Sequence, residues 1–198
     1  MSTVSHSAEG TSQREFVIDL NFDKFRKIMV RKDATSAIVA NTGMQLIDQQ
    51  LQGVDVDLKG EERPLLSALI GNSKAELAAT KQLVVSLEDP ELNADRLSLT
   101  QTADLQTDHM NVRTTANQPA GNLESYQTIL QAKRSEGSTR VSVSVEMRVR
   151  VEVPKLFVAR ADKRVQLAAE KATQDQMAAI QDFIAAHQNE MLVLPEIR

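Results

Sequence analysis

One stretch of strict alternation constrains the fold of this chain more than any other feature of its sequence. Over residues 141–153 every odd-numbered position is apolar, and every even-numbered position is Ser, Glu or Arg. Alternation with a period of two is typical of a β-strand that buries one face. At ~3.3 Å per residue this strand would reach roughly 43 Å, about twice the usual strand length. Pro154 lacks the N–H that a sheet ladder needs, so we expect the strand to end there.

A long helix is expected directly after this strand, over residues 162–189. Its inward candidates include Val165, Ala169, Ile180 and Phe183. At ~1.5 Å per residue the helix would span roughly 42 Å, which matches the strand. These two elements predict the α+β class, with a long-stranded, mainly antiparallel sheet and helices packed on one face.

The remaining segments predict a single α+β domain over residues 15–190. Residues 1–14 are small and polar and predict a flexible N-terminal arm, whereas residues 191–198 are apolar and predict an extended C-terminal tail. Alternation predicts strands over residues 16–22 and 54–58, and an extended segment over residues 97–115. Helices are expected over residues 34–52, after a capping Asp33, and over residues 73–87, where Ser73 and Glu76 have capping-box spacing. Residues 124–133 fit helix and strand equally.

Composition excludes several classes of protein. The chain has no Cys, which excludes disulfides, thiolate metal sites and Cys nucleophiles. It has neither the ~20 uninterrupted apolar residues of a membrane helix nor the N-terminal apolar run of a signal peptide, so the expected location is the cytoplasm. A net charge of −4 with 3% aromatic residues does not fit a nucleic-acid-binding surface.

No motif for enzyme chemistry is present. The seven glycines are nowhere closer than seven positions apart, so no phosphate-binding loop can be built from them. There is no nucleophile elbow, and the base of a serine triad could come only from His6, His109 or His187. We interpret His187, beside Phe183 on the apolar face of the last helix, as a half-buried structural residue. The sequence therefore predicts no catalytic residue, no cofactor and no enzyme.

Two acidic clusters are tested as metal sites and rejected. Residues 55–60 begin like a calcium loop with Asp55, Asp57 and Gly60, but the required Glu is replaced by Leu66. Asp104 and Asp108 would lie on one face of an extended segment and His109 on the other, so they would not converge. We therefore predict no metal.

A basic stretch lies near the N-terminus. We favour its interpretation as a solvated rim around a buried Phe25, and the alternative is contact with an anionic surface. The stretch contains Lys24, Arg26, Lys27, Arg31 and Lys32.

A strand as long as residues 141–153 raises the question of what covers its edges. Unpaired ladder groups invite another chain, and the two terminal segments could supply it. We therefore predict a non-enzymatic structural subunit of a homo-oligomeric assembly, built by sheet extension and exchange of terminal arms. Its interface would contain Val141, Val143, Glu146, Arg148, Arg150, Glu152, Leu192 and Leu194. The alternative is a small binding or carrier module with an apolar pocket for a lipid-like ligand.

Overall fold

The computed structural model describes residues 2–31, 33–40, 43–58 and 75–190. These residues form one seven-stranded antiparallel sheet in the order β1-β7-β6-β5-β4-β3-β2. Its strands are β1 (Thr3–Ile18), β2 (Met44–Leu58), β3 (Ala75–Leu87), β4 (Arg96–Leu105), β5 (His109–Ala116), β6 (Leu123–Ser135) and β7 (Ser138–Pro154). The helices are α1 (Phe22–Met29), α2 (Ala34–Ala40) and α4 (Val158–His187), with short 3₁₀ turns η1 (Pro90–Leu92) and η2 (Lys155–Phe157). The predicted α+β class is confirmed.

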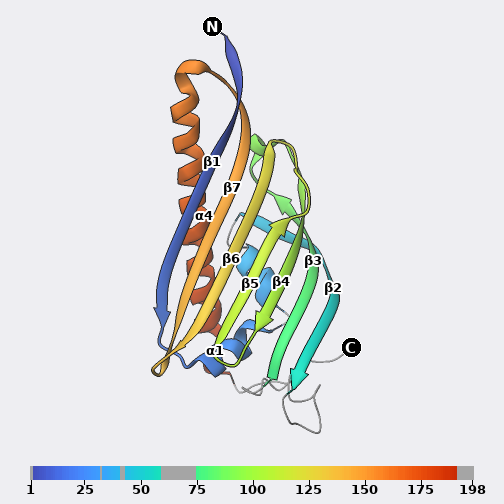
Figure 1. Cartoon of the computed structure of the whole chain (residues 1–198), viewed down its shortest axis with the longest axis vertical. Helices are drawn as coiled ribbons and strands as arrows, with labels where there is room; N and C mark the ends of the chain where they lie inside the picture. The colour runs from blue at the N-terminus through green and yellow to red at the C-terminus, as the bar shows by residue number, and fades with distance from the viewer. Residues whose placement is uncertain (1, 32, 41–42, 59–74, 191–198) are drawn as a thin grey trace.

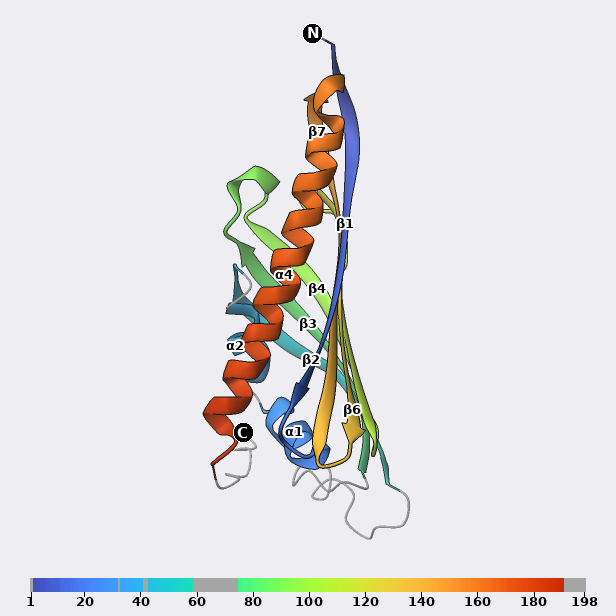
Figure 2. The ribbon, with the colours of Figure 1, turned by 90° about the vertical axis from the view of Figure 1, so that its left-hand side faces the viewer.

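The strand and helix that dominate the sequence pattern form as expected. Strand β7 contains the whole alternating stretch, and Val141, Val143 and Val145 are almost completely buried. Helix α4 lies along β7 and β1, and α1 and α2 lie on the same side of the sheet (Figures 1 and 2). Buried Val165, Ala169 and Ile180 face the sheet, since apolar residues three or four positions apart share one side of a helix.

The N-terminal segment differs from its prediction. Residues 3–14, expected as a flexible arm, belong to β1, which pairs with β7 from Thr3↔Pro154 to Ile18↔Thr139. Composition misses this strand because backbone hydrogen bonds to a long neighbour stabilise it, and these do not depend on apolar side chains. Gly10 of β1 also lets α4 approach closely, since a Cβ there would lie 2.4 Å from the Val165 carbonyl oxygen.

Strand β7 is paired on both sides and has no free edge, although the assembly prediction depended on such an edge. Strand β7 has β1 on one side and β6 on the other, so its ladder is satisfied within the chain. Among the strands of the described ranges, β1 and β2 are the edges instead.

Two predicted helices are strands over much of their length. The helix expected over residues 34–52 ends at Ala40, and Gly43 follows with a φ of 74° before β2 begins at Met44. The helix expected over residues 73–87 is β3, in which Leu83 and Val85 are buried on one face. Ala, Glu, Lys and Leu favour helix locally, but pairing with β2 and β4 overrides that preference. The ambiguous residues 124–133 are part of β6, and residues 97–115 form the β4–β5 hairpin.

Candidate functional site

The main candidate site is a cavity of about 510 Å³ between the sheet and the helices. Strands β2 to β6 form its floor, and α2, the residues around Val30 and one residue of α4 complete it. Most of its wall is apolar. Representative wall residues are Ile38, Leu77, Leu83, Leu99, Val112 and Leu130.

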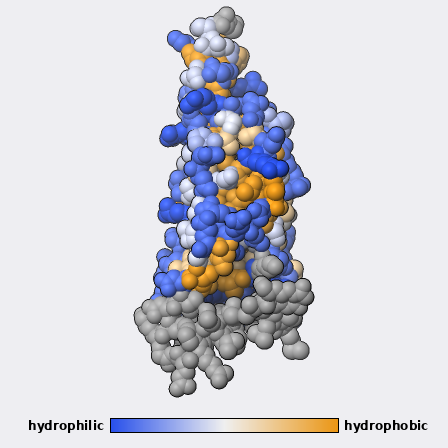
Figure 3. All heavy atoms as spheres, turned by 90° about the vertical axis from the view of Figure 1, so that its right-hand side faces the viewer, coloured by the Kyte–Doolittle hydropathy of each residue, from blue (hydrophilic) through white to orange (hydrophobic). Residues whose placement is uncertain are grey.

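Exposed apolar side chains mark the mouth of the cavity. Val30, Leu51 and Val54 line the cavity and are 45%, 59% and 49% exposed, respectively. Leu51 and Val54 belong to the edge strand β2. Figure 3 faces that side of the molecule and shows apolar surface interrupting the polar surface. The cavity therefore opens beside β2 in the part of the chain that the structure describes.

A row of four polar residues crosses the apolar floor. Lys81 of β3 pairs across the sheet with Gln101 of β4, Gln101 with Thr114 of β5, and Thr114 with Thr128 of β6. All four line the cavity. We call these four residues the polar row. The Gln101 side-chain nitrogen donates to the Thr114 hydroxyl at 3.3 Å, and the Thr35 hydroxyl of α2 lies 3.5 Å from the Gln101 carbonyl oxygen.

The polar row separates two apolar clusters. On one side lie Leu83, Leu99 and Tyr126, and on the other lie Met110 and Leu130. Polar groups in the middle of an apolar wall oppose folding unless they find partners. In ligand-binding proteins, a few such groups placed in an apolar pocket orient the ligand.

Lys81 is the exceptional member of the polar row. Removal from water lowers the pKa of its ammonium group below the ordinary value. Among the described residues, its ammonium group has no hydrogen-bond or ion-pair partner. Arg31, the other cation at the cavity, bonds to Glu190 at 2.7 Å and to Asp33 at 3.4 Å. Lys81 is therefore the cation at this cavity without a described partner.

Two further polar groups line the cavity. Burial raises the pKa of Tyr126 to about 12, so its phenol remains neutral and can serve only as a hydrogen-bonding group. The side-chain oxygen of Gln176, from α4, is buried and has no hydrogen-bond partner among the described residues. Both groups could therefore bond to a ligand.

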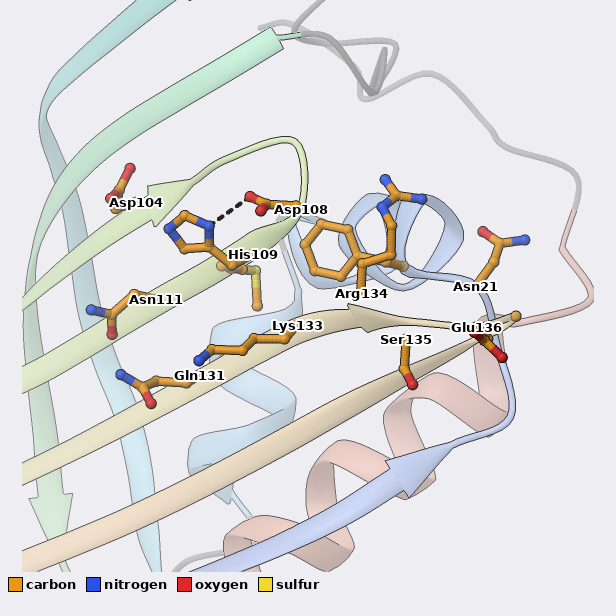
Figure 4. A pocket seen from close by; sticks show the side chains of 13 residues that line it. Asn21, Asp104, Asp108, His109, Asn111, Gln131, Lys133, Arg134, Ser135 and Glu136 are labelled. Carbon is orange, nitrogen blue, oxygen red and sulfur yellow. Dashed lines mark hydrogen bonds and ion pairs between the residues drawn. The ribbon is translucent and has the colours of Figure 1, made fainter.

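A second hollow lies outside the sheet, at the turns that join β4 to β5 and β6 to β7 (Figure 4). Arg134 donates two hydrogen bonds to Asp23 at 2.7 and 3.0 Å and lies over the Phe22 ring, 5.4 Å from its centroid. The bond from Arg134 lowers the pKa of Asp23. These polar groups hold α1 against the end of β6, which is a structural role.

The acidic cluster that the sequence analysis rejected as a metal site lies in this second hollow. His109 Nδ1 is 2.7 Å from the Asp108 carboxylate, and this bond lowers the pKa of Asp108. Asp104 lines the hollow without joining the pair (Figure 4). Within the described ranges no three His, Asp or Glu side chains are grouped so that they could hold a metal ion. Residues 59–60 and 66, part of the calcium-loop comparison, lie outside those ranges.

The residues predicted for an interface fall into three groups. Val141 and Val143 are fully buried inside the chain, so they offer no surface to a partner. Glu146, Arg148, Arg150 and Glu152 are exposed on the other face, where Arg148 pairs with Glu9 and Arg150 with Glu124. Leu192 and Leu194 lie outside the described residues.

The structure describes most of the basic stretch and the two remaining histidines, and contact of the stretch with an anionic surface stays a prediction. Arg26 is buried, Arg31 is paired, and Lys24 and Lys27 lie on α1, while Lys32 is outside the described residues. His187 is half-buried against Phe183, as predicted, with ring centroids 4.5 Å apart, and its Nδ1 is 3.0 Å from Glu190. His6 lies in β1 and is 2.6 Å from Asp162.

None of the four residues of the polar row is among the residues that the sequence predicts for a site. The alternation Leu77, Ala79, Lys81, Leu83, Val85 contains the signal, which is a lysine at a position where a strand would be buried. This signal does not stand out in the sequence, because the same residues also fit a helical pattern with a capping box.

Neither the family models nor the curated proteins match this chain. Solved structures do match, at low sequence identity. A protein of unknown function from Staphylococcus aureus is 9% identical, with a TM-score of 0.52 over 93% of this chain and 98% of that one. The aromatase/cyclase ZhuI from Streptomyces sp. R1128 is 8% identical, with a TM-score of 0.50 over 92% of this chain and 99% of that one. A START superfamily protein from Mycobacterium smegmatis is 10% identical, with a TM-score of 0.48 over 89% and 97%.

At these identities the matches with TM-scores of 0.50 and 0.52 establish a shared fold and no more. That fold, an antiparallel sheet with a long C-terminal helix packed on it, spans nearly the whole chain. The prediction of a structural assembly subunit is wrong: it depended on a free edge of β7, and β7 is paired with β1 and β6 within the chain, in a fold shared with a protein named as an aromatase/cyclase. The absence of enzymatic activity, the homo-oligomer and the cytoplasmic location stay predictions. No helix in the described ranges is long and apolar enough to cross a membrane.

Proposed function

We propose that this chain is a binding or carrier module that holds an apolar, lipid-like small molecule between its sheet and its helices. The observation that carries the proposal is the apolar cavity of about 510 Å³, which lies within the range of ligand pockets. Protein interiors are otherwise packed as densely as organic crystals. We therefore interpret a cavity of this size as the place of a ligand.

Two features of the cavity support binding. Its mouth is formed by the exposed apolar residues Leu51 and Val54, which give an apolar ligand a continuous path to the interior. Polar residues are a minority of its wall, and four of them form the polar row across an otherwise apolar floor, as is typical of sites that orient a largely apolar molecule.

The chemistry of the wall favours binding over catalysis. Among the described wall residues there is no Asp, Glu or His to act with Lys81 as an acid–base pair. We therefore propose a role that changes no covalent bond in the ligand.

Binding of the neutral fluorescent dye Nile red tests the proposal, with one variant that fills the cavity and one matched control. Ala79 lines the cavity, and its neighbour Ala78 is exposed on the other face of β3. We expect Ala79→Phe to weaken dye binding by about tenfold or more, which corresponds to at least ~1.4 kcal/mol, and Ala78→Phe to leave it unchanged.

Equal effects of the two substitutions, or no dye binding by the unsubstituted protein, would contradict the proposal. Extraction of the purified protein into organic solvent, followed by mass spectrometry, would identify a ligand carried through purification.

A further inference from the structure

The polar row carries an inference about which ligand the cavity takes. This inference rests on the proposed function and deepens it. Its starting point is the charge of the cavity wall, which is positive at Lys81 and Arg31 and includes no carboxylate among its described residues.

The surroundings of Lys81 supply no counter-charge from within the sheet. Its cross-strand neighbours are Leu51 on β2 and Gln101 on β4, and its neighbours on the same face of β3 are Ala79 and Leu83. None of these four can carry a negative charge. A cation that is partly removed from water and lacks a counter-ion opposes folding, so its presence needs another explanation.

Arg31 does not share this condition. Its guanidinium group bonds to Glu190 and Asp33, which neutralise it. The cation that remains available to a ligand is therefore Lys81, near the mouth that Leu51 helps to form.

The groups around Lys81 suit the head group and the body of an amphipathic ligand. The Gln101 amide is the cross-strand neighbour of Lys81 in the polar row, so it lies beside any group that pairs with Lys81. The apolar wall on both sides of the polar row would receive the rest of the molecule. One lysine matches the single charge of a carboxylate better than a phosphate monoester, which carries close to two charges at neutral pH.

We propose that the natural ligand is an amphipathic monocarboxylate whose carboxylate pairs with the Lys81 ammonium group while its apolar body fills the cavity. If Lys81 only extended its side chain toward water, its charge would not change the affinity for ligands with different head groups. The two explanations therefore differ in a measurable way.

The test is displacement of Nile red by dodecanoate, by dodecyl phosphate and by uncharged dodecan-1-ol. It compares the unsubstituted protein with Lys81→Met, which keeps most of the length of the side chain and removes its charge, and with Lys81→Arg. The matched control is Lys133→Met, because Lys133 is exposed on the outer face of β6.

We expect Lys81→Met to weaken dodecanoate binding by about 10- to 100-fold, the range of a hydrogen bond to a charged group. Binding of dodecan-1-ol should change by less than about threefold, Lys81→Arg should retain most of the dodecanoate affinity, and Lys133→Met should change neither ligand. In the unsubstituted protein, dodecanoate should bind more tightly than dodecyl phosphate.

Equal losses for dodecanoate and dodecan-1-ol in Lys81→Met would overturn the carboxylate proposal and leave the proposed function intact. If dodecyl phosphate binds more tightly than dodecanoate, the proposal of a carboxylate head group is wrong and a phosphate takes its place. If neither Nile red nor dodecan-1-ol binds, the proposed function itself fails. Should Lys81→Met not fold, the unsubstituted protein decides the question, since equal affinity for dodecanoate and methyl dodecanoate would refute the pairing.

Discussion

Replacing Gly10 by alanine should destabilise the protein by pushing helix α4 away from strand β1. A Cβ built at Gly10 lies 2.4 Å from the Val165 carbonyl oxygen and 2.8 Å from its carbonyl carbon, and both atoms belong to the helix backbone. Ordinary contact begins at 3.4 Å, so the helix and the strand must separate by about 1 Å. Unlike the end of a flexible side chain, backbone atoms cannot move aside alone.

The expected magnitude combines two opposing effects. Overpacking of this kind costs about 1–3 kcal/mol, and the smaller conformational freedom of alanine in the unfolded chain returns about 0.4–1 kcal/mol. We expect a net loss of roughly 1–2 kcal/mol in the free energy of unfolding, or a fall in Tm of roughly 2–8 °C for a chain of this size. Urea unfolding followed by circular dichroism measures the first quantity, and a thermal scan measures the second.

Gly53 provides the matched control. Its added Cβ would meet nothing within 4 Å, and it lies in strand β2 at an irregularity in the pairing with β3. We expect Gly53→Ala to leave stability unchanged or to raise it by up to about 1 kcal/mol. If Gly10→Ala proves as stable as the unsubstituted protein, the close packing of α4 on β1 is wrong.

Two further predictions concern titratable groups. Asp23 has a pKa lowered by its bonds to Arg134, so its contribution to stability should be complete above its ordinary pKa of 3.8 and lost as the pH falls through the lower folded value. Asp23→Asn should therefore cost less than about 1 kcal/mol at neutral pH, since the pair is partly exposed, and the difference from the unsubstituted protein in urea unfolding should vanish in strong acid. For Lys81, the folded pKa lies below the ordinary 10.5, so the unfolded chain binds more protons between the two values and stability should rise with pH across that interval. Lys81→Met should abolish this rise and make the empty protein more stable at neutral pH; a less stable Lys81→Met protein would show that the ammonium group has a stabilising partner.

The last of these predictions connects stability with function. If Lys81 opposes folding of the empty protein and strengthens binding of a carboxylate, the same side chain lowers the stability of the fold and raises the affinity for the ligand. Residues that a fold tolerates rather than needs are commonly found where a ligand binds.

The sequence by itself determines the elements whose pattern is long and unambiguous. The alternation over residues 141–153 admits one structure, because a strand has a side-chain period of two and a helix does not. The apolar face of α4 is equally clear, and the two lengths correctly indicate that the helix packs along the strand. From these elements follow the α+β class and an antiparallel sheet with helices on one side.

Tertiary structure decides the segments whose local preference is weak or misleading. Residues 3–14 have too few apolar side chains to predict a strand, yet they pair with β7 because the ladder uses backbone groups that every residue carries. Residues 75–87 resemble a helix locally and become β3 because strands on both sides pair with them.

The candidate site belongs entirely to this second category. Lys81, Gln101, Thr114 and Thr128 are unremarkable polar residues at separate places in the sequence, and they form a row only through the register of three strand pairs. Register depends on turns, bulges and buried contacts taken together, so no single segment encodes it. The sequence provides a lysine at an inward position of a strand; the fold decides that the lysine faces a cavity where no described residue neutralises it.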